Sequence, residues 1–525
     1  MATELVRALL ESHGAHARKL RRVLTLLSDD WHTLADLVRL PAVPRRTVQD
    51  VLKALDADVE TNGDRFRIVP SRVPAYAEFR VPAHAESRVP THTGPTADAD
   101  LADPLDALVS RNTTHLRSIS ADIASVPPPL AALDHVQATA ETALKRALWL
   151  DSQYDLDGRV LLCLGDHDLT SLAVCAVNPS VSVVVVDVDD RLLAYVEQRS
   201  GGRVRTLHAD FRFGLPPTVL ESADLVFSDP PYTPEGMALF AGRAVECLAD
   251  LGQGRLLLAY GFSDRTPALG LKVQQELQRL GLVFEAILPA FHRFDGAQAI
   301  GSAADLYVCR PTTRRSVTPG RTTIYTHGPQ SVEATGPGSK ALEALVDLAP
   351  RPESSPPPKP RAPGWADPIG RGAASLAVDL SGDPGPWLLR TLLACSPGRM
   401  AALVSNNHPN VSSAAGQAEL TSLVDTRFAL RFLRSTPDGK HCVVVADQVL
   451  AGTLDAGGLA VREVLMRAHG KLGNVWREAL TIVLRITKRE ARERIGEHDD
   501  LEHRLIDLPR HRIAALLPLI RESAG

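Results

Sequence analysis

The sequence lacks the features that mark membrane proteins, secreted proteins and nucleic-acid-binding proteins. None of its apolar runs reaches the length needed to span a membrane, and its start shows no signal-peptide pattern. Its 58 lysines and arginines nearly balance its 62 aspartates and glutamates, for a formal net charge of −4. This balance argues against attraction of the whole protein to nucleic acid or to an anionic membrane. We therefore expect a cytoplasmic protein with neither kind of partner.

Cysteine is also scarce. Six cysteines are scattered over 525 residues, mostly within apolar runs, and no pair has C-x-x-C spacing. This pattern predicts buried free thiols of a reducing compartment and argues against disulfides and zinc sites. We therefore predict no metal site.

Residues 1–69 have the pattern of a small helical domain with a hairpin. Helical stretches at 17–27, 34–40 and 45–55 precede two short strands around Asn62-Gly63, and this order predicts a winged helix. Such a unit could bind DNA through its third helix. Its few basic residues and several acidic ones favour a scaffold or dimer arm instead.

Two stretches are predicted to be linkers. Residues 70–104 contain Arg-Val-Pro three times at eight-residue spacing, and proline-rich polar sequence of this kind favours an extended tether. Residues 335–375 are rich in proline and glycine. The last part of the chain, 376–525, has strand patterns followed by long helical ones, which predicts an α+β accessory domain of unknown role.

Residues 105–334 alternate between strand and helix patterns. The predicted strands are 160–164, 182–187, 203–207, 224–228, 254–260, 282–288 and 304–309. Helical stretches separate most of them, which predicts a parallel sheet with crossover helices. We therefore expect a Rossmann-like, doubly wound α/β domain here.

The first of these strands leads into an unusual turn. It is apolar throughout and ends at Gly165, where the backbone can turn tightly and admit a ligand. Asp166 and Asp168 follow immediately, before the next helix. Ligands of open α/β sheets bind outside the carboxyl ends of the strands. A phosphate-binding loop would be rich in glycine and free of acid, so this turn should prefer a cation.

A second turn follows the strand at 224–228. Its sequence is Asp229-Pro230-Pro231-Tyr232, and two consecutive prolines make it stiff. In a doubly wound sheet this turn lies beside the first one. Three carboxylates and the Tyr232 ring should therefore converge on one crevice.

Another acidic pair follows the second strand of this domain. Asp187 ends that strand, and Asp189 lies just beyond. An acid about 20 residues after a glycine turn commonly binds the ribose hydroxyls of an adenosine group. Helix capping or solvation would also explain single acids in such turns, and Asp168 could cap the helix that begins at Leu169. His167 has no clear ligand partners, so we assign it no metal role.

The two turn motifs together resemble those of a known family. Gly165-Asp-His-Asp-Leu-Thr-Ser171 resembles the Gly-Asp-Asp-Asp motif of the branched-chain polyamine synthases, which make N(4)-bis(aminopropyl)spermidine. Ser228-Asp-Pro-Pro-Tyr-Thr233 resembles their Pro-Asp-Pro-Pro-Tyr-Thr motif. Further similarity lies in Gln137, Thr139 to Thr142, Arg146, Asp210 to Arg212 and Ile324 to Pro329. The resemblance covers roughly residues 1–330, including the family's winged helix, and departs at His167 and Ser228.

The resemblance implies transfer of an aminopropyl group from decarboxylated S-adenosylmethionine to a secondary amine of a linear, spermidine-like polyamine. The products are a branched polyamine and methylthioadenosine. Both substrates are cationic, and Asp166, Asp168 and Asp229 supply negative groups that can bind them and take part in catalysis.

The remaining roles complete this expectation. Asp229 can accept the proton of the attacking amine, and Tyr232 can contact the polyamine cation. The residues expected to bind the donor are Gly165, Asp187, Asp189, Asp210, Gln137 and Thr139. The reaction needs no metal, and we expect a homodimer.

Two other interpretations stay open. Asp-Pro-Pro-Tyr also occurs in S-adenosylmethionine-dependent methyltransferases that act on amino groups of nucleic-acid bases. The carboxylate of S-adenosylmethionine would be repelled by Asp166 and Asp168, which argues against that function. The other alternative is a non-enzymatic polyamine-sensing regulator, which the intact turn at Asp229 disfavours.

Overall fold

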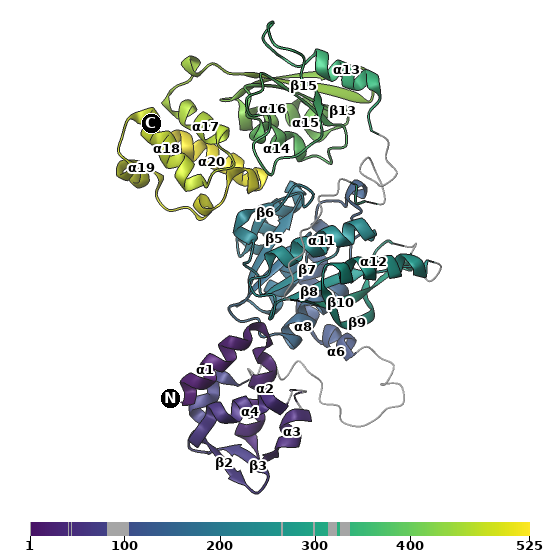
Figure 1. The fold of residues 1–525 in the computed structure, drawn as a ribbon, viewed down its shortest axis with the longest axis vertical. Coiled ribbons are helices and arrows are strands. Elements are labelled where there is room, and N and C mark those ends of the chain that lie inside the picture. Colours follow the sequence, from purple (N-terminus) through teal and green to yellow (C-terminus); the bar gives the residue numbers. More distant parts are fainter. Residues whose placement is uncertain are drawn as a thin grey trace.

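The computed structural model describes residues 2–39, 41, 43, 45–80, 104–263, 266–297, 300–312, 323–325 and 336–525. Three units follow one another along the long axis of the molecule, and the central α/β domain lies between the N-terminal and C-terminal units (Figure 1). No helix in the described ranges is long and apolar enough to cross a membrane.

The N-terminal unit consists of helices followed by a small antiparallel sheet of order β1-β3-β2. Its elements are α1 (Ala2–His13), α2 (Ala17–Asp29), β1 (His32–Thr33), α3 (Leu34–Arg39), α4 (Arg45–Leu55), β2 (Val59–Asn62) and β3 (Arg65–Ile68). The three predicted helices and the hairpin are confirmed, and α1 is an additional helix. Its apolar side chains Val6 and Leu10 pack into the core of the unit.

The first part of the predicted linker 70–104 belongs to this unit instead. A short 3-10 helix, Val73–Phe79, buries Tyr76 and Phe79 in the N-terminal core. The Tyr76 hydroxyl donates a hydrogen bond of 2.6 Å to Asp58, which fixes the segment. The rest of that predicted linker, residues 81–103, lies outside the described residues.

The central domain is built on a seven-stranded sheet of order β6-β5-β4-β7-β8-β10-β9 among the described residues. Its strands are β4 (Val160–Leu164), β5 (Ser182–Asp187), β6 (Val204–His208), β7 (Leu225–Ser228), β8 (Arg255–Tyr260), β9 (Leu282–Arg293) and β10 (Ala303–Pro311). Strands β4 to β8 are parallel, so the Rossmann-like core is confirmed. The prediction of an all-parallel sheet is wrong at β10, which is antiparallel to β8 and β9. The connection between β9 and β10 is too short for the crossover that parallel pairing requires.

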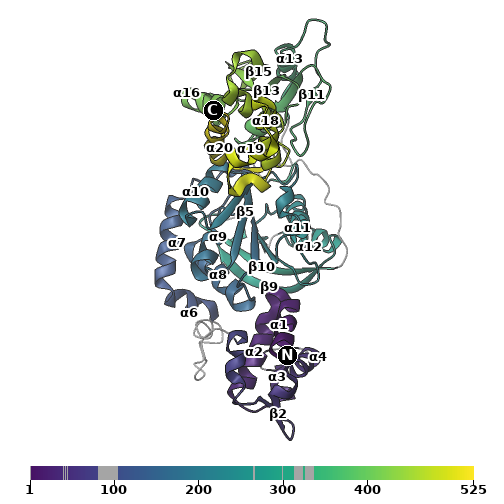
Figure 2. The same cartoon turned by 90° about the vertical axis from the view of Figure 1, so that its left-hand side faces the viewer.

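Helices cover both faces of this sheet. They are α6 (Pro104–Arg111), α7 (Thr113–Ser125), α8 (Ala140–Gln153), α9 (Thr170–Val177), α10 (Asp190–Ser200), α11 (Pro234–Cys247) and α12 (Pro267–Arg279). Figure 2 shows α6 to α10 on one face and α11 with α12 on the other. Leu161 and Cys163 of β4 pack into the first layer, whereas Leu162 and Leu164 pack into the second. This two-residue alternation explains why the strand is apolar throughout.

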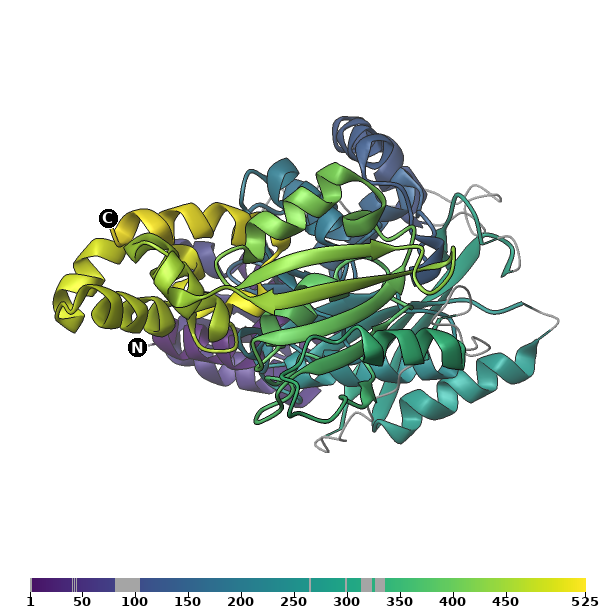
Figure 3. The same ribbon diagram turned by 90° about the horizontal axis from the view of Figure 1, so that it is seen from above.

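The C-terminal unit is a mixed sheet of order β11-β12-β13-β15-β14 with helices around it. The strands are β11 (Pro360–Arg361), β12 (Leu376–Leu380), β13 (Arg399–Ser405), β14 (Phe428–Arg434) and β15 (His441–Gln448). The helices are α13 (Ser339–Asp347), α14 (Trp387–Ala394), α15 (Pro409–Ser412), α16 (Ala414–Val424), α17 (Ala456–Met466), α18 (Leu472–Leu484), α19 (Lys488–Ile495) and α20 (Arg510–Ser523). Figure 3 shows the last four helices gathered beside the sheet, near the C-terminus.

The prediction that residues 335–375 form a linker is wrong at α13 and β11. Helix α13 buries Ala341 and Leu345 against the C-terminal sheet, and β11 pairs with β12. These apolar residues lie one helical turn apart and pack on one face of the C-terminal sheet. The sequence around them did not indicate that this sheet would be their partner. The C-terminal unit therefore begins with α13.

The outer units contact opposite ends of the central sheet. The N-terminal unit packs near the amino ends of the strands, where Arg21 forms an ion pair of 2.8 Å with Asp155 in the loop after α8. The C-terminal unit packs at the carboxyl ends of β5 and β6 and shares one continuous hydrophobic cluster with α11 and α12. The predicted C-terminal accessory domain therefore shares part of its core with the central domain.

Two glycines of the central domain allow a test of backbone strain. Gly165 and Gly201 have left-handed φ angles of 73° and 62°. A Cβ atom at Gly165 would lie 3.7 Å from Phe240, an ordinary contact, and one at Gly201 would meet nothing within 4 Å. Gly165→Ala and Gly201→Ala should each lower the free energy of unfolding by about 1–2 kcal/mol, the cost of a left-handed alanine. Urea denaturation measures this loss, and a much larger loss at Gly165 would show that its surroundings are more crowded than described.

Candidate functional site

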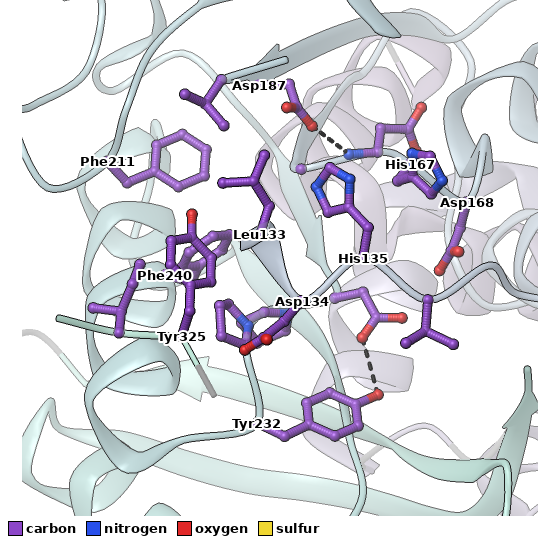
Figure 4. Close-up of a pocket in the computed structure, with 18 of the residues that line it drawn as sticks. Leu133, Asp134, His135, His167, Asp168, Asp187, Phe211, Tyr232, Phe240 and Tyr325 are labelled. Carbon is purple, nitrogen blue, oxygen red and sulfur yellow. Dashed lines mark hydrogen bonds between the residues drawn. The ribbon is translucent and has the colours of Figure 1, made fainter. Parts of the chain in front are cut away.

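A cavity of about 450 Å³ opens at the carboxyl ends of β4, β5, β6 and β7. The turns that follow these strands line it, together with the loop 133–136 that precedes α8. Figure 4 shows its labelled side chains pointing toward one another from these different elements. The cavity lies where the acidic turns of the sequence predict a crevice.

The two carboxylates of the first acidic turn have different hydrogen-bond partners. Asp166 accepts hydrogen bonds from the backbone N–H and the hydroxyl of Ser171, in the first turn of α9. Asp168 accepts from the backbone N–H of Ala138 at 2.7 Å. The alternative that Asp168 caps α9 is therefore wrong, because Leu169 occupies the cap position in a left-handed conformation and Asp166 satisfies the helix donor.

A buried arginine joins the two acidic turns. The Arg146 side chain in α8 is 1% exposed, and its guanidinium lies 2.8 Å from Asp168 and 2.9 Å from Asp229. Its Nε also donates to Nδ1 of His292 at 3.0 Å. The predicted convergence of the carboxylates is confirmed, but with a cation between two of them. The sequence analysis named Arg146 as part of the family resemblance but gave it no role. The residues around it in α8 do not reveal which carboxylates its side chain contacts.

The pKa values of Asp229 and Asp168 are shifted in opposite directions. Burial, and then the charge of Asp168, raise the pKa of Asp229 to about 7. Burial also opposes ionisation of Asp168, but the charge of Arg146 and the hydrogen bonds from Ala138 and Arg146 together outweigh it and lower the pKa of that carboxyl. Asp168 is therefore charged at neutral pH, whereas Asp229 is close to its midpoint and suited to exchange protons. The Tyr232 hydroxyl donates to Asp229 at 3.0 Å and orients the carboxylate.

Two more carboxylates in the cavity have raised pKa values. Burial raises the pKa of Asp166 to about 7 and that of Asp187 to about 6. Asp187 accepts from the backbone N–H groups of Asp166 at 3.1 Å and Asp189 at 2.8 Å. Each oxygen of Asp187 has room for one more donor, such as a ribose hydroxyl.

Three of the predicted donor-binding side chains lie outside the cavity lining. Asp189 caps α10 and pairs with Arg191 at 2.7 Å. Thr139 caps α8, and the Gln137 amide donates to the carbonyl of Ala138 at 3.3 Å. Their roles in ligand binding stay predictions. Helix caps and ligand-binding groups use the same residue types, which is why sequence patterns do not separate them.

The loop 133–136 and several aromatic residues line the cavity without having been predicted. His135 stacks on His167 with ring centroids 4.6 Å apart. Burial, and then the neighbouring His135, lower the pKa of His167 to about 4, so this imidazole is uncharged at neutral pH. The loop has no periodic pattern, and only its position before helix α8 could have indicated it.

The cavity has two chemically different ends. One end, the apolar end, carries the aromatic rings of Phe211, Phe240 and Tyr325 (Figure 4). The other end holds the carboxylates of the two acidic turns and Tyr232. Figure 4 shows Phe211, Phe240 and Tyr325 gathered on one side and Asp168 on the other. Thr326 to Pro329, which share the family resemblance with Tyr325, lie outside the described residues.

The described residues were also compared with the requirements of a metal site. Within the described ranges, no three His, Cys, Asp or Glu side chains are grouped so that they could hold a metal ion. The carboxylates of the cavity have arginine, hydroxyl and backbone N–H partners instead.

Part of the chain is similar in sequence to a known protein family. Residues 116–316 match the model of the branched-chain polyamine synthase A C-terminal domain. The chain is 33% identical over 174 residues to an uncharacterized protein of Methanocaldococcus jannaschii, which covers 32% of this chain and 43% of that protein. It is 28% identical over 177 residues to the N(4)-bis(aminopropyl)spermidine synthase of Thermococcus kodakarensis, covering 32% of this chain and 49% of the synthase. The chain thus spans less than half the length of these two relatives.

A solved structure of the family is also similar. The branched-chain polyamine synthase C9 mutein from Thermus thermophilus, in complex with N4-aminopropylspermidine and 5′-methylthioadenosine, matches with 19% identity and a TM-score of 0.37. The match covers 61% of this chain and 96% of that one. The likeness to the family rests on the matched sequence and not on this structure. Residues 116–316, which match the model of the branched-chain polyamine synthase A C-terminal domain, carry both acidic turns.

Proposed function

We propose that the protein is an aminopropyltransferase that uses decarboxylated S-adenosylmethionine as donor. The acceptor is a secondary amine of a linear, spermidine-like polyamine, and the products are a branched polyamine and methylthioadenosine. The observation that carries this proposal is the two-ended cavity, because a nucleoside with a cationic tail has the same two-part character. Matched relatives named N(4)-bis(aminopropyl)spermidine synthase support it.

The two ends of the cavity favour one orientation of the donor. Its adenine ring lies at the apolar end near Phe211 and Phe240, whose rings pack edge to face 4.7 Å apart. Asp187 accepts hydrogen bonds from the ribose hydroxyls. The sulfonium and the aminopropyl ammonium then reach the acidic end, where Asp168 carries its charge.

The chain positions the acceptor and takes its proton. The lone pair of the attacking nitrogen forms a bond to the carbon next to sulfur, the carbon–sulfur bond breaks, and its electron pair stays on sulfur. The nitrogen loses one proton, which Asp229 accepts. Arg146 and Tyr232 hold that carboxylate in place, and the Tyr232 ring can contact the polyamine cation. Positioning contributes much of the acceleration in a displacement of this kind.

The remaining expectations belong to the same proposal. Residues 1–69 form a winged helix that serves as a scaffold or dimer arm, and the protein is a cytoplasmic homodimer without nucleic-acid or membrane partners. The edge strand β9 supports self-association, because Val283 and Ile287 are 51% and 39% exposed there and offer apolar surface to a second copy.

Donor selectivity tests the assignment most directly. Decarboxylated S-adenosylmethionine should bind at least about tenfold more tightly than S-adenosylmethionine, because the extra carboxylate would face Asp168 in a partly buried site. Isothermal titration calorimetry measures both affinities. Equal affinities would contradict aminopropyl transfer, and binding of S-adenosylmethionine alone would favour a methyltransferase.

Replacing the proton acceptor should separate chemistry from binding. Asp229→Asn keeps the shape of the side chain but cannot accept the proton, so turnover should fall about 10²-fold while donor affinity changes little. Asp224→Asn is a matched control at the other end of the same strand, where Asp224 accepts from the backbone of Val160 at 2.8 Å. Steady-state kinetics compare the two variants. Near wild-type turnover of Asp229→Asn would move the proton acceptor elsewhere, with Asp168 the next candidate.

The raised pKa values predict a pH-dependent affinity. The pKa values of Asp166 and Asp229 are about 7 and that of Asp187 about 6, so lowering the pH from about 8 to about 6 protonates them and removes negative charge. Affinity for the cationic donor should fall over this range, and affinity for uncharged methylthioadenosine should fall much less. Calorimetry in matched buffers measures both. A constant ratio of the two affinities would show that these carboxylates do not attract the donor's charge.

A further inference from the structure

The C-terminal unit reaches a residue of the cavity wall. Trp387 is the first residue of α14 and is 3% exposed. Its indole N–H donates a hydrogen bond of 3.1 Å to Oδ2 of Asp210, which lines the cavity just after β6. An element far along the chain thus supports the site directly.

The Asp210 carboxylate is fully occupied by protein donors. Its Oδ1 accepts from the backbone N–H of Arg212 at 3.0 Å and from Nε of Arg212 at 2.8 Å. Its Oδ2 accepts from Nη2 of Arg212 and from Trp387. A carboxylate has about four acceptor sites, so all of them are used. Asp210 therefore fixes the shape of the turn after β6 and has no free acceptor for a ligand.

The same contacts support the aromatic wall of the apolar end. The Arg212 guanidinium carbon lies 4.8 Å from the Trp387 ring centre and 5.3 Å from that of Tyr325. Tyr325 and Phe211, the residue between Asp210 and Arg212, both line the cavity. Figure 4 shows Phe211 and Tyr325 on the same side of it. Trp387 therefore lies one layer behind the aromatic side chains that line the apolar end of the cavity.

A second residue of α14 holds the neighbouring strand ends. Arg390 lies one helical turn after Trp387, and its side chain is completely buried. It forms an ion pair of 2.8 Å with Asp190, at the start of α10, and donates to Nδ1 of His208 at 3.0 Å. His208 ends β6, and Asp190 is three residues beyond the proposed ribose acceptor Asp187. One face of α14 thus fastens both strand ends that border the nucleoside half of the cavity.

We infer that the C-terminal unit, through Trp387 and Arg390, sets the position of the wall that receives the nucleoside part of the donor. This inference rests on the proposed function. The family match ends at residue 316, so this role lies outside the family domain. Trp387 and Arg390 are positioning residues: they touch the wall and not the substrate.

The test removes one hydrogen bond and keeps the aromatic ring. Trp387→Phe in the full chain should weaken the affinity for methylthioadenosine, measured by calorimetry, about fivefold to tenfold, the scale of one ordinary net hydrogen bond. KM for the donor should rise by a similar factor, with kcat and KM for spermidine nearly unchanged. Trp476→Phe is the matched control, because it removes a buried indole hydrogen bond of 2.9 Å to Ser523 within the C-terminal unit. The control should leave the affinity for methylthioadenosine unchanged.

The outcomes separate this inference from the function on which it rests. If the wild-type protein fails to bind methylthioadenosine, the proposed function is overturned. If it binds and Trp387→Phe binds equally well, or if Trp476→Phe weakens binding as much, the positioning role is overturned and the proposed function stands. If Trp387→Phe does not fold, Arg390→Lys, which keeps the charge facing Asp190 but loses the bond to His208, decides by the same split between donor KM and kcat.

Discussion

The buried guanidinium of Arg146 is the interaction on which the site depends. An arginine with 1% exposure would be very costly to bury alone, and its ion pairs with Asp168 and Asp229 offset that cost. The same ion pairs hold together two turns that β5, β6 and their connecting helices separate along the chain. Pairing of β4 with β7 brings the two turns together, and without this cation their carboxylates would repel each other. Helix α8, which carries Arg146, is therefore as much a part of the site as the strand ends.

The cavity also shows how a protein can bury several acids before any ligand arrives. The raised pKa values of Asp166, Asp187 and Asp229 mean that these groups can take up protons and avoid an unpaired charge. An entering cation favours their ionised forms, so binding releases protons. The acidic end is thus adjustable, whereas the Asp168–Arg146 pair is fixed. The apolar end needs no such adjustment.

Much of the central fold could be predicted because its signals are local. Apolar runs bounded by turn residues predict the strands from β4 to β8 closely, whereas β9 extends beyond its predicted end to Arg293. The acids after β4, β5 and β7 meet because parallel strands end at one edge. What could not be predicted depends on distant partners. The role of Arg146, the stack of His135 on His167 and the packing of α13 all require knowing which segments meet in space. Asp189 and Thr139 show the reverse problem, since capping gives them the same local pattern as ligand binding.

The hydrophobic cluster shared by the central domain and the C-terminal unit has a consequence for how the chain is made. The central sheet and α11 leave the ribosome before α14, α17 and α18 exist, although their side chains belong to one continuous core. Domains generally fold in order of synthesis, so the central domain must wait with part of its apolar surface uncovered. During that interval the nascent chain exposes apolar side chains to water. Completion of the last helices then closes the surface and ends the exposure.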